Sequence, residues 1–179
     1  FFRAVTIAPA VKSWILEMRF KPQPVHRSGF FVPERAMHGA PPTVGRMFIQ
    51  PDVEVDGRTV KLDEVLGLGF VLLGFECDPA AHLDEGATRV LEELDARVVR
   101  VVESRAGDAH HRLAAAWPGT RVVEDVANEL RPWFQQRQAQ VVLLRPDRYV
   151  AAVGSSASIG RDLVSLGHLL TAGVAGAAR

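Results

Sequence analysis

Cys77 is the side chain whose chemistry is easiest to put to use, because a cysteine thiolate can act as a nucleophile or as a redox group. A thiol relay needs a second sulfur, and Cys77 is the only cysteine in the sequence. A single cysteine also excludes an internal disulfide and a zinc site built from several cysteines of one chain. We therefore expect a half-buried, inert thiol in a reducing compartment, and a redox enzyme that uses Cys77 is the weaker alternative.

Two segments come nearest to a phosphate-binding loop. Gly67-Leu68-Gly69 has the spacing of the first two glycines of a dinucleotide-binding motif, but Leu72 stands in the place of the third glycine. A strand and not a helix is expected to follow, so no helix amino terminus would face a phosphate, and we expect a structural turn. The segment from Gly154 to Ser158 does precede an expected helix, where an anion could sit. Capping of that helix is the more common use of such residues.

Neither the histidines nor the clustered charges complete a known kind of site. His110 and His111 are adjacent and point in different directions, and no carboxylate stands at a spacing that completes a metal site. We expect them to be solvated helix residues. Arg145, Asp147 and Arg148 lie in a predicted turn. They either form an ion pair, contact a neighbouring domain or are simply the solvated charged residues of an ordinary turn. The sequence thus predicts no catalytic, cofactor-binding or metal-ligating residue.

From Met47 onward the chain alternates between expected strands and helices. Turn dipeptides and apolar spacing predict a small hairpin about Asp56-Gly57 with Val53, Val55, Val60 and Leu62 as its apolar positions, a buried strand at 70–75, a helix at 84–94 and a strand at 98–102. The same signals then predict a short helix at 110–117, a brief extended piece at 122–123 and a helix at 130–134, which has Pro132 in its first turn and Trp133 and Phe134 as core anchors. Two strands are expected at 141–144 and 149–153, joined by a type I turn, and a closing helix is expected at 159–170. The strand–helix–strand unit and the later hairpin indicate a mixed sheet, so we predict an α/β fold with a thioredoxin-like arrangement.

The first 46 residues differ from the rest in composition. Seven of the eleven prolines fall in the first 51 residues, and residues 1–46 carry seven Lys or Arg against two Asp or Glu, whereas residues 47–179 carry fourteen against nineteen. One amphipathic helix is expected between the prolines, with its apolar face formed by Val11, Trp14, Ile15 and Met18. We predict a tail and linker over 1–46 and a domain over 47–179. The basic tail is either solvated or rests against an acidic neighbour.

The overall composition is that of a globular protein. The 179 residues are 47% hydrophobic and 23% charged, and the net charge of zero favours neither nucleic acid nor an anionic membrane as a partner. The longest apolar stretches, 65–75 and 163–178, are shorter than the ~20 apolar residues that span a bilayer. The start Phe1-Phe2-Arg3 shows neither a signal peptide nor an initiator Met, which favours a fragment. We expect a soluble, cytoplasmic protein.

Two segments together carry a resemblance to a known family. Gly-Arg-Met-Phe-Ile-Gln-Pro at 45–51 leads to Leu-Asp-Glu-Val-Leu-Gly-Leu-Gly-Phe at 62–70, and Leu-Arg-Pro-Asp-Arg-Tyr-Val follows at 144–150. This pair resembles the carboxy-terminal region of the flavin-dependent aromatic hydroxylases, closest to the 3-(3-hydroxyphenyl)propionate hydroxylase and phenol hydroxylase type. Phe-Lys-Pro-Gln-Pro at 20–24 is similar to the way the catalytic portion of that family ends before its linker. The resemblance therefore covers nearly the whole chain.

The resemblance implies a thioredoxin-like domain that follows flavin and substrate domains. The parent enzyme is expected to use FAD and NAD(P)H and to hydroxylate a phenolic ring through a flavin hydroperoxide. The family's flavin-binding glycine motif does not lie in this sequence, and no catalytic residue of the family is carried over to a position here. The family's terminal domain generally lacks the redox pair of thioredoxin, and the single Cys77 agrees with that pattern.

The role implied for this chain is structural. It would cover the flavin domain, contribute to a subunit interface of a homodimer, and be inactive without the upstream domains of the same chain. The alternative is a stand-alone thioredoxin-like binding or dimerisation module without redox activity.

Overall fold

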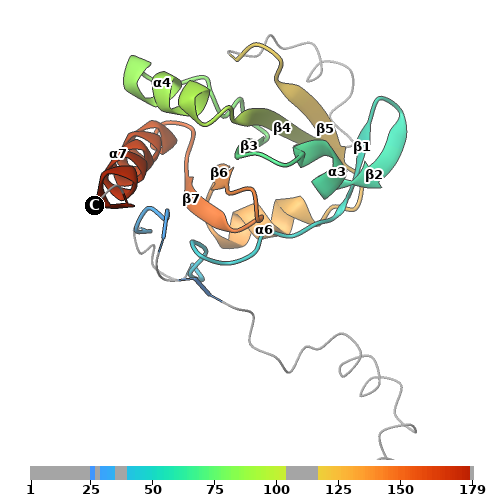
Figure 1. Ribbon diagram of the computed structural model, residues 1–179. Coiled ribbons are helices and arrows are strands. Elements are labelled where there is room, and N and C mark those ends of the chain that lie inside the picture. The colour runs from blue at the N-terminus through green and yellow to red at the C-terminus, as the bar shows by residue number, and fades with distance from the viewer. Residues whose placement is uncertain (1–24, 27–28, 35–39, 104–116, 178–179) are drawn as a thin grey trace, which may run out of the picture.

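The computed structural model describes residues 25–26, 29–34, 40–103 and 117–177 (Figure 1). The helix expected around Val11 to Met18 lies outside these residues. So does most of the helix expected at 110–117, including both adjacent histidines. Residues 117–120 form a turn, in which the amide of Thr120 donates to the carbonyl of Trp117 at 3.3 Å.

The described residues form one mixed sheet of seven strands in the order β2-β1-β5-β4-β3-β6-β7. The strands are β1 (Asp52–Val55), β2 (Arg58–Lys61), β3 (Val71–Phe75), β4 (Arg97–Glu103), β5 (Arg121–Asp125), β6 (Val141–Leu144) and β7 (Val150–Gly154). β3, β4 and β5 run parallel, and the β1–β2 and β6–β7 hairpins add antiparallel pairs at the two ends. The mixed α/β sheet predicted from the sequence is confirmed.

Helices cover both faces of this sheet (Figure 1). They are α3 (Leu62–Leu66), α4 (Glu85–Glu93), α6 (Leu130–Gln136) and α7 (Ile159–Ala177). α3 and α6 contribute to one hydrophobic cluster, which includes Trp133 and Phe134. α4 and α7 pack together over the other cluster. Alternate residues of the central strands enter the two clusters, so Leu73 faces one and Leu72 the other, as the two-residue period of a strand requires.

Two helices begin where acidic side chains accept their free amides. Asp84 precedes α4, and its carboxylate accepts from the amide of Ala87 at 2.8 Å, so the helix predicted at 84–94 is confirmed and begins at an acidic cap. α6 is capped from a distance, because the buried carboxylate of Asp125 at the end of β5 accepts from the amides of Glu129, Leu130 and Arg131 at 3.2, 3.0 and 3.3 Å. Pro132 lies in the first turn of α6, as expected.

Two elements differ from the sequence-based expectation. Leu62 does not belong to the hairpin strand but begins α3, where it is fully buried. A five-residue helix is too short for apolar spacing to reveal it. The extended piece expected at 122–123 is the complete strand β5, which pairs with β4 in parallel and with β1 in antiparallel orientation. Those pairings come from residues far away in the sequence, so local composition understates the strand.

Residues that precede 47 lie along the outer edge of β7. The amide of Val32 donates to the carbonyl of Ala151, the amide of Gly45 donates to the carbonyl of Val150, and the amide of Val150 donates to the carbonyl of Arg46, each at 2.9 Å. Val32 itself is buried. We call these three residues, Val32, Gly45 and Arg46, the β7 cover. They satisfy backbone groups that an edge strand would otherwise leave open.

Candidate functional site

The charged residues of the turn at Arg145–Arg148 contact several other segments of the chain. The amide of Arg148 donates to the carbonyl of Arg145 at 2.9 Å, with Pro146 and Asp147 between them, as a type I turn requires. Arg148 then has a φ of +66°, and the amide of Arg145 donates to the carbonyl of Tyr149 at 2.9 Å. This backbone sends the side chains of Arg145 and Arg148 to different parts of the chain.

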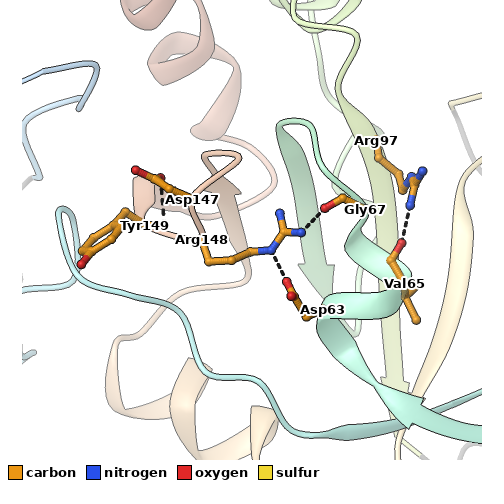
Figure 2. Close-up of polar contacts among 7 residues, drawn as sticks. All are labelled: Asp63, Val65, Gly67, Arg97, Asp147, Arg148 and Tyr149. Atoms are coloured by element: carbon orange, nitrogen blue, oxygen red, sulfur yellow. Dashed lines mark hydrogen bonds and ion pairs between the residues drawn. The ribbon is translucent and has the colours of Figure 1, made fainter.

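Arg148 joins the two segments on which the family resemblance rests. Its Nε donates to the carboxylate of Asp63, and its Nη2 donates to the carbonyl of Gly67 at the end of α3 (Figure 2). The side chain of Arg148 is only 11% exposed, so this guanidinium is held between the β6–β7 turn and α3. The sequence left open an ion pair or a contact with a neighbouring domain. The structure shows the ion pair, and its acid lies in the same sheet-and-helix unit.

A second arginine holds the same loop from β4. Nη1 of Arg97 donates to the carbonyl of Val65 at 2.5 Å (Figure 2). Gly67 has a φ of +69°, and a Cβ atom built on it would lie 2.6 Å from Nη1 of Arg97. We call Gly67–Gly69 the pinned loop. It ends a helix and leads into β3, so it lacks the helix amino terminus that a phosphate-binding loop needs.

Arg145 makes the matching contact toward the linker. Its Nε and Nη2 donate to the two oxygens of Asp147 at 3.1 and 2.8 Å, and its guanidinium carbon lies 4.6 Å from the centre of the Phe31 ring. The turn thus contacts α3 through one arginine and the linker through the other. These contacts position segments of the chain, and nothing in them resembles a nucleophile with an adjacent base.

Cys77 lies two residues after the end of β3 and is half-buried, with its sulfur 3.7 Å from the carbonyl of Gln140. Burial raises the pKa of the Cys77 thiol from an ordinary 9.0 to about 11; the Arg100 guanidinium opposes this shift, and the Asp78 and Glu76 carboxylates reinforce it. The thiol therefore stays protonated near neutral pH, which makes it a weak nucleophile.

The segment Gly154 to Ser158 borders a cavity of about 320 Å³ between the linker, α6 and α7. The amide of Ser155 donates to the hydroxyl of Ser158 at 3.0 Å, and the amides of Ser158 and Ile159 donate to the carbonyl of Ser155 at 3.1 Å. The serines therefore close the turn that leads into α7. Arg137, also on the cavity wall, donates to the carbonyl of Trp133 at 3.0 Å and lies over its ring.

Two further properties of the described residues bear on the kind of site. Among them, no group of three His, Cys, Asp or Glu side chains is placed to hold a metal ion. No helix in that part of the chain is long and apolar enough to cross a membrane.

Asp63, Gly67 and Arg97 were not singled out as a cluster by spacing, because their contacts join separate elements. The signal that could have found them was the segment 62–70 of the resemblance, in which an acid and two glycines flank a short apolar run. Asp125 likewise gave no signal, because it caps a helix that begins several residues later.

Comparison with known proteins identifies a family and relatives with a similar sequence. Residues 45–168 match the family model described as HcaD C-terminal domain. The chain is 41% identical over 150 residues to a 3-(3-hydroxy-phenyl)propionate/3-hydroxycinnamic acid hydroxylase of Burkholderia vietnamiensis, with 83% of this chain and 27% of that protein covered. A 3-(3-hydroxy-phenyl)propionate/3-hydroxycinnamic acid hydroxylase of Klebsiella pneumoniae is 38% identical over 172 residues, with 96% of this chain and 30% of that protein covered. The chain thus spans less than a third of the length of these relatives.

Solved structures share the fold. The flavin-dependent monooxygenase PieE, solved in complex with FAD and substrate, superposes with a TM-score of 0.56 at 17% identity and covers 90% of this chain and 28% of its own. A thiol peroxidase from Chromobacterium violaceum superposes with a TM-score of 0.51 at 15% identity, with 77% and 91% covered. At these identities the likeness concerns the fold alone, and it confirms the predicted thioredoxin-like arrangement.

Proposed function

This chain belongs to the HcaD C-terminal domain family, and on that premise we propose that it is the non-catalytic carboxy-terminal domain of a larger FAD- and NAD(P)H-dependent aromatic hydroxylase. The observation that carries the proposal is the match to hydroxylases of which this chain spans only 27% to 30%. The substrate of the whole enzyme would be a phenolic aromatic acid such as 3-(3-hydroxyphenyl)propionate. The enzyme would work in the cytoplasm, with a homodimer as its assembly.

The described residues fit a supporting role better than a cofactor site. The pinned loop precedes a strand, Arg97 occupies the space beside Gly67, and Arg148 already binds the carbonyl of Gly67. The serines before α7 form hydrogen bonds with each other within the turn that leads into that helix. These residues do not fit a flavin phosphate, so FAD would be bound by upstream domains of the same polypeptide. Residues 1–46 would be the tail of the catalytic portion and the linker, and residues 47–179 the terminal domain.

The test compares residues 1–179 with the full-length polypeptide that contains them. We expect the full-length protein to purify with FAD and to oxidise NAD(P)H when a phenolic acid is added, and the 179-residue chain to purify without flavin and to be inactive. Flavin bound stoichiometrically to the 179-residue chain would contradict the proposal. So would a stop codon and a start site directly upstream of Phe1.

A stand-alone thioredoxin-like binding or dimerisation module is the second candidate. One observation favours it, namely that a conserved Bacteroides fragilis protein of unknown function with this fold is covered over 99% of its own length, so the fold exists without further domains. A redox enzyme that uses Cys77 is less well supported, because the raised pKa of the thiol and the lack of a second cysteine in the sequence both oppose it.

A further inference from the structure

Leu68 is the most exposed large apolar side chain of the described residues, with 93% of its surface accessible. The other exposed large apolar side chains are Val25 and Phe30 at 38%, Leu169 at 40% and Met47 at 51%. A leucine in this position gains nothing from the hydrophobic effect unless another surface covers it. It lies in the middle of the pinned loop, between two glycines that contribute no side chain to shield it.

The loop that carries Leu68 is held firmly from two sides. Arg148 binds the carbonyl of Gly67, and Arg97 binds the carbonyl of Val65 (Figure 2). Asp63 in turn holds the guanidinium of Arg148. Contacts of this kind fix the backbone before any partner arrives, so docking through Leu68 costs little conformational entropy.

Met47 lies next to the same arginine. It forms a bridge with Tyr149, and the amide of Phe48 donates to the carbonyl of Arg148 at 2.8 Å. Arg148 therefore connects the backbone beside Met47 with the backbone beside Leu68. We call Met47 and Leu68 the docking pair.

We propose that the docking pair is a contact through which this domain packs on the catalytic portion of the same polypeptide. This inference rests on the proposed function, because the occupant is the part of the chain that the relatives have in addition. A tethered partner has a high effective concentration, so a small apolar contact is enough to keep it in place.

The charge of α3 argues against a second copy of this domain as the occupant. Glu64 lies exposed on α3, shortly before the pinned loop, whereas the carboxylate of Asp63 is already paired with Arg148. A symmetric contact between two copies brings the same patch together, so Glu64 would approach its own copy. A different surface need not repeat that charge, and the length that the relatives have beyond this chain supplies such a surface within one polypeptide.

The test measures how fast a thiol at position 68 reacts in the full-length protein. Leu68→Cys and, as the control, Leu169→Cys are each made in a Cys77→Ser background, and maleimide labelling is followed by mass spectrometry of the peptides. If nothing covers this domain, a thiol at position 68 should react faster than one at position 169, because Leu68 is the more exposed of the two residues. Docking reverses the order: we expect labelling at 68 to be about tenfold slower than at 169, because a covered thiol reacts only when the contact opens.

Equal or faster labelling at 68 would overturn the inference. Protection that disappears on dilution would also overturn it, because the occupant would then be a second copy. The flavin content of the same samples tests the proposed function separately. A flavin-free full-length protein would refute that function, and the labelling ratio would still report whether the upstream chain covers Leu68.

Discussion

At Gly67 the backbone and one neighbouring side chain both restrict the residue type. Its φ of +69° is a conformation that residues with a Cβ atom rarely adopt, and the Arg97 guanidinium lies where that Cβ would be. Gly57 in the β1–β2 turn has a nearly equal φ of +72°, but an added Cβ would meet nothing within 4 Å. A side chain added at Gly57 would therefore cause backbone strain alone, whereas one added at Gly67 would cause the same strain and also a steric clash with Arg97.

We predict that Gly67→Ala lowers the free energy of unfolding more than Gly57→Ala does. Both variants pay for an unfavourable φ, about 1 kcal/mol each, and Gly67→Ala also displaces Arg97 from the carbonyl of Val65, which adds about 1 kcal/mol. Urea denaturation of the two variants measures the difference. In an Arg97→Ala background the difference should vanish. An equal loss in the two single variants would contradict the proposed role of Arg97.

Cys77 gives a pH-dependent stability that can be isolated. The folded protein keeps the thiol proton up to about pH 11, whereas an ordinary thiol loses it near 9.0. The folded state binds the proton more tightly, so the contribution to stability is complete below about pH 9 and is lost as the pH rises toward about 11.

We therefore predict that the free energy of unfolding falls more steeply with pH in the unsubstituted protein than in Cys77→Ala over this range. Denaturation curves at several alkaline pH values give both slopes, and groups other than the thiol cancel in the comparison. Parallel slopes would show that the thiol titrates normally.

At the scale of elements, α6 depends on an acid that lies outside it. Asp125 is 1% exposed, and its carboxylate accepts three amides at the start of the helix. The same helix supplies Trp133 and Phe134 to the core below the sheet. Loss of the cap would therefore weaken both the helix start and the packing of these two rings.

We predict that Asp125→Ala destabilises the protein by about 2 to 3 kcal/mol, because it leaves buried donors without an acceptor. Asp125→Asn, which retains one acceptor oxygen, should cost less. The matched control is Asp52→Ala, which removes only a half-exposed ion pair with Lys61 and should change stability by less than about 1 kcal/mol. Thermal or urea denaturation ranks the three variants, and a loss at position 125 no greater than at position 52 would refute the capping role.

Elements with strong local signals were predictable from the sequence. Continuous apolar runs predicted β3 and β6, and apolar residues at helical spacing predicted α4, since these signals depend on neighbours in the chain. α3 and the full extent of β5 were not predictable, because their stability comes from tertiary packing and strand pairing. The contact between Arg148 and Asp63 was hidden for the same reason: the two residues are 85 positions apart, and charged residues in a turn usually face water.

The whole molecule is closed at one edge by residues that a boundary at 47 would remove. β7 receives its outer hydrogen bonds from the β7 cover, and at the opposite end of the sheet β2 carries the charged residues Arg58 and Lys61. Charges of this kind protect a sheet edge without a covering segment. β7 has mostly small apolar residues, Val-Ala-Ala-Val-Gly, so its protection comes from the cover.

We predict that a chain of residues 47–179 is less stable than one of residues 25–179 by about 2 to 4 kcal/mol, from the lost backbone hydrogen bonds and the lost burial of Val32. It should also self-associate through the uncovered strand. Denaturation and light scattering measure the two effects. Val32→Ala in the longer chain is the control, since it keeps the backbone hydrogen bonds and should stay monomeric if the longer chain is. A 47–179 chain of undiminished stability would show that the cover is dispensable.

The β7 cover also sets an order of events during synthesis. A ribosome makes Val32 and Gly45 long before it makes Val150 and Ala151, so the covering segment leaves the exit tunnel while the strand it will join does not yet exist. Its amides must remain hydrated until translation has passed β7. These residues, which are made before the strands of the sheet, are therefore among the last to reach their final neighbours, and a nascent chain released just before β7 could not seal its own sheet.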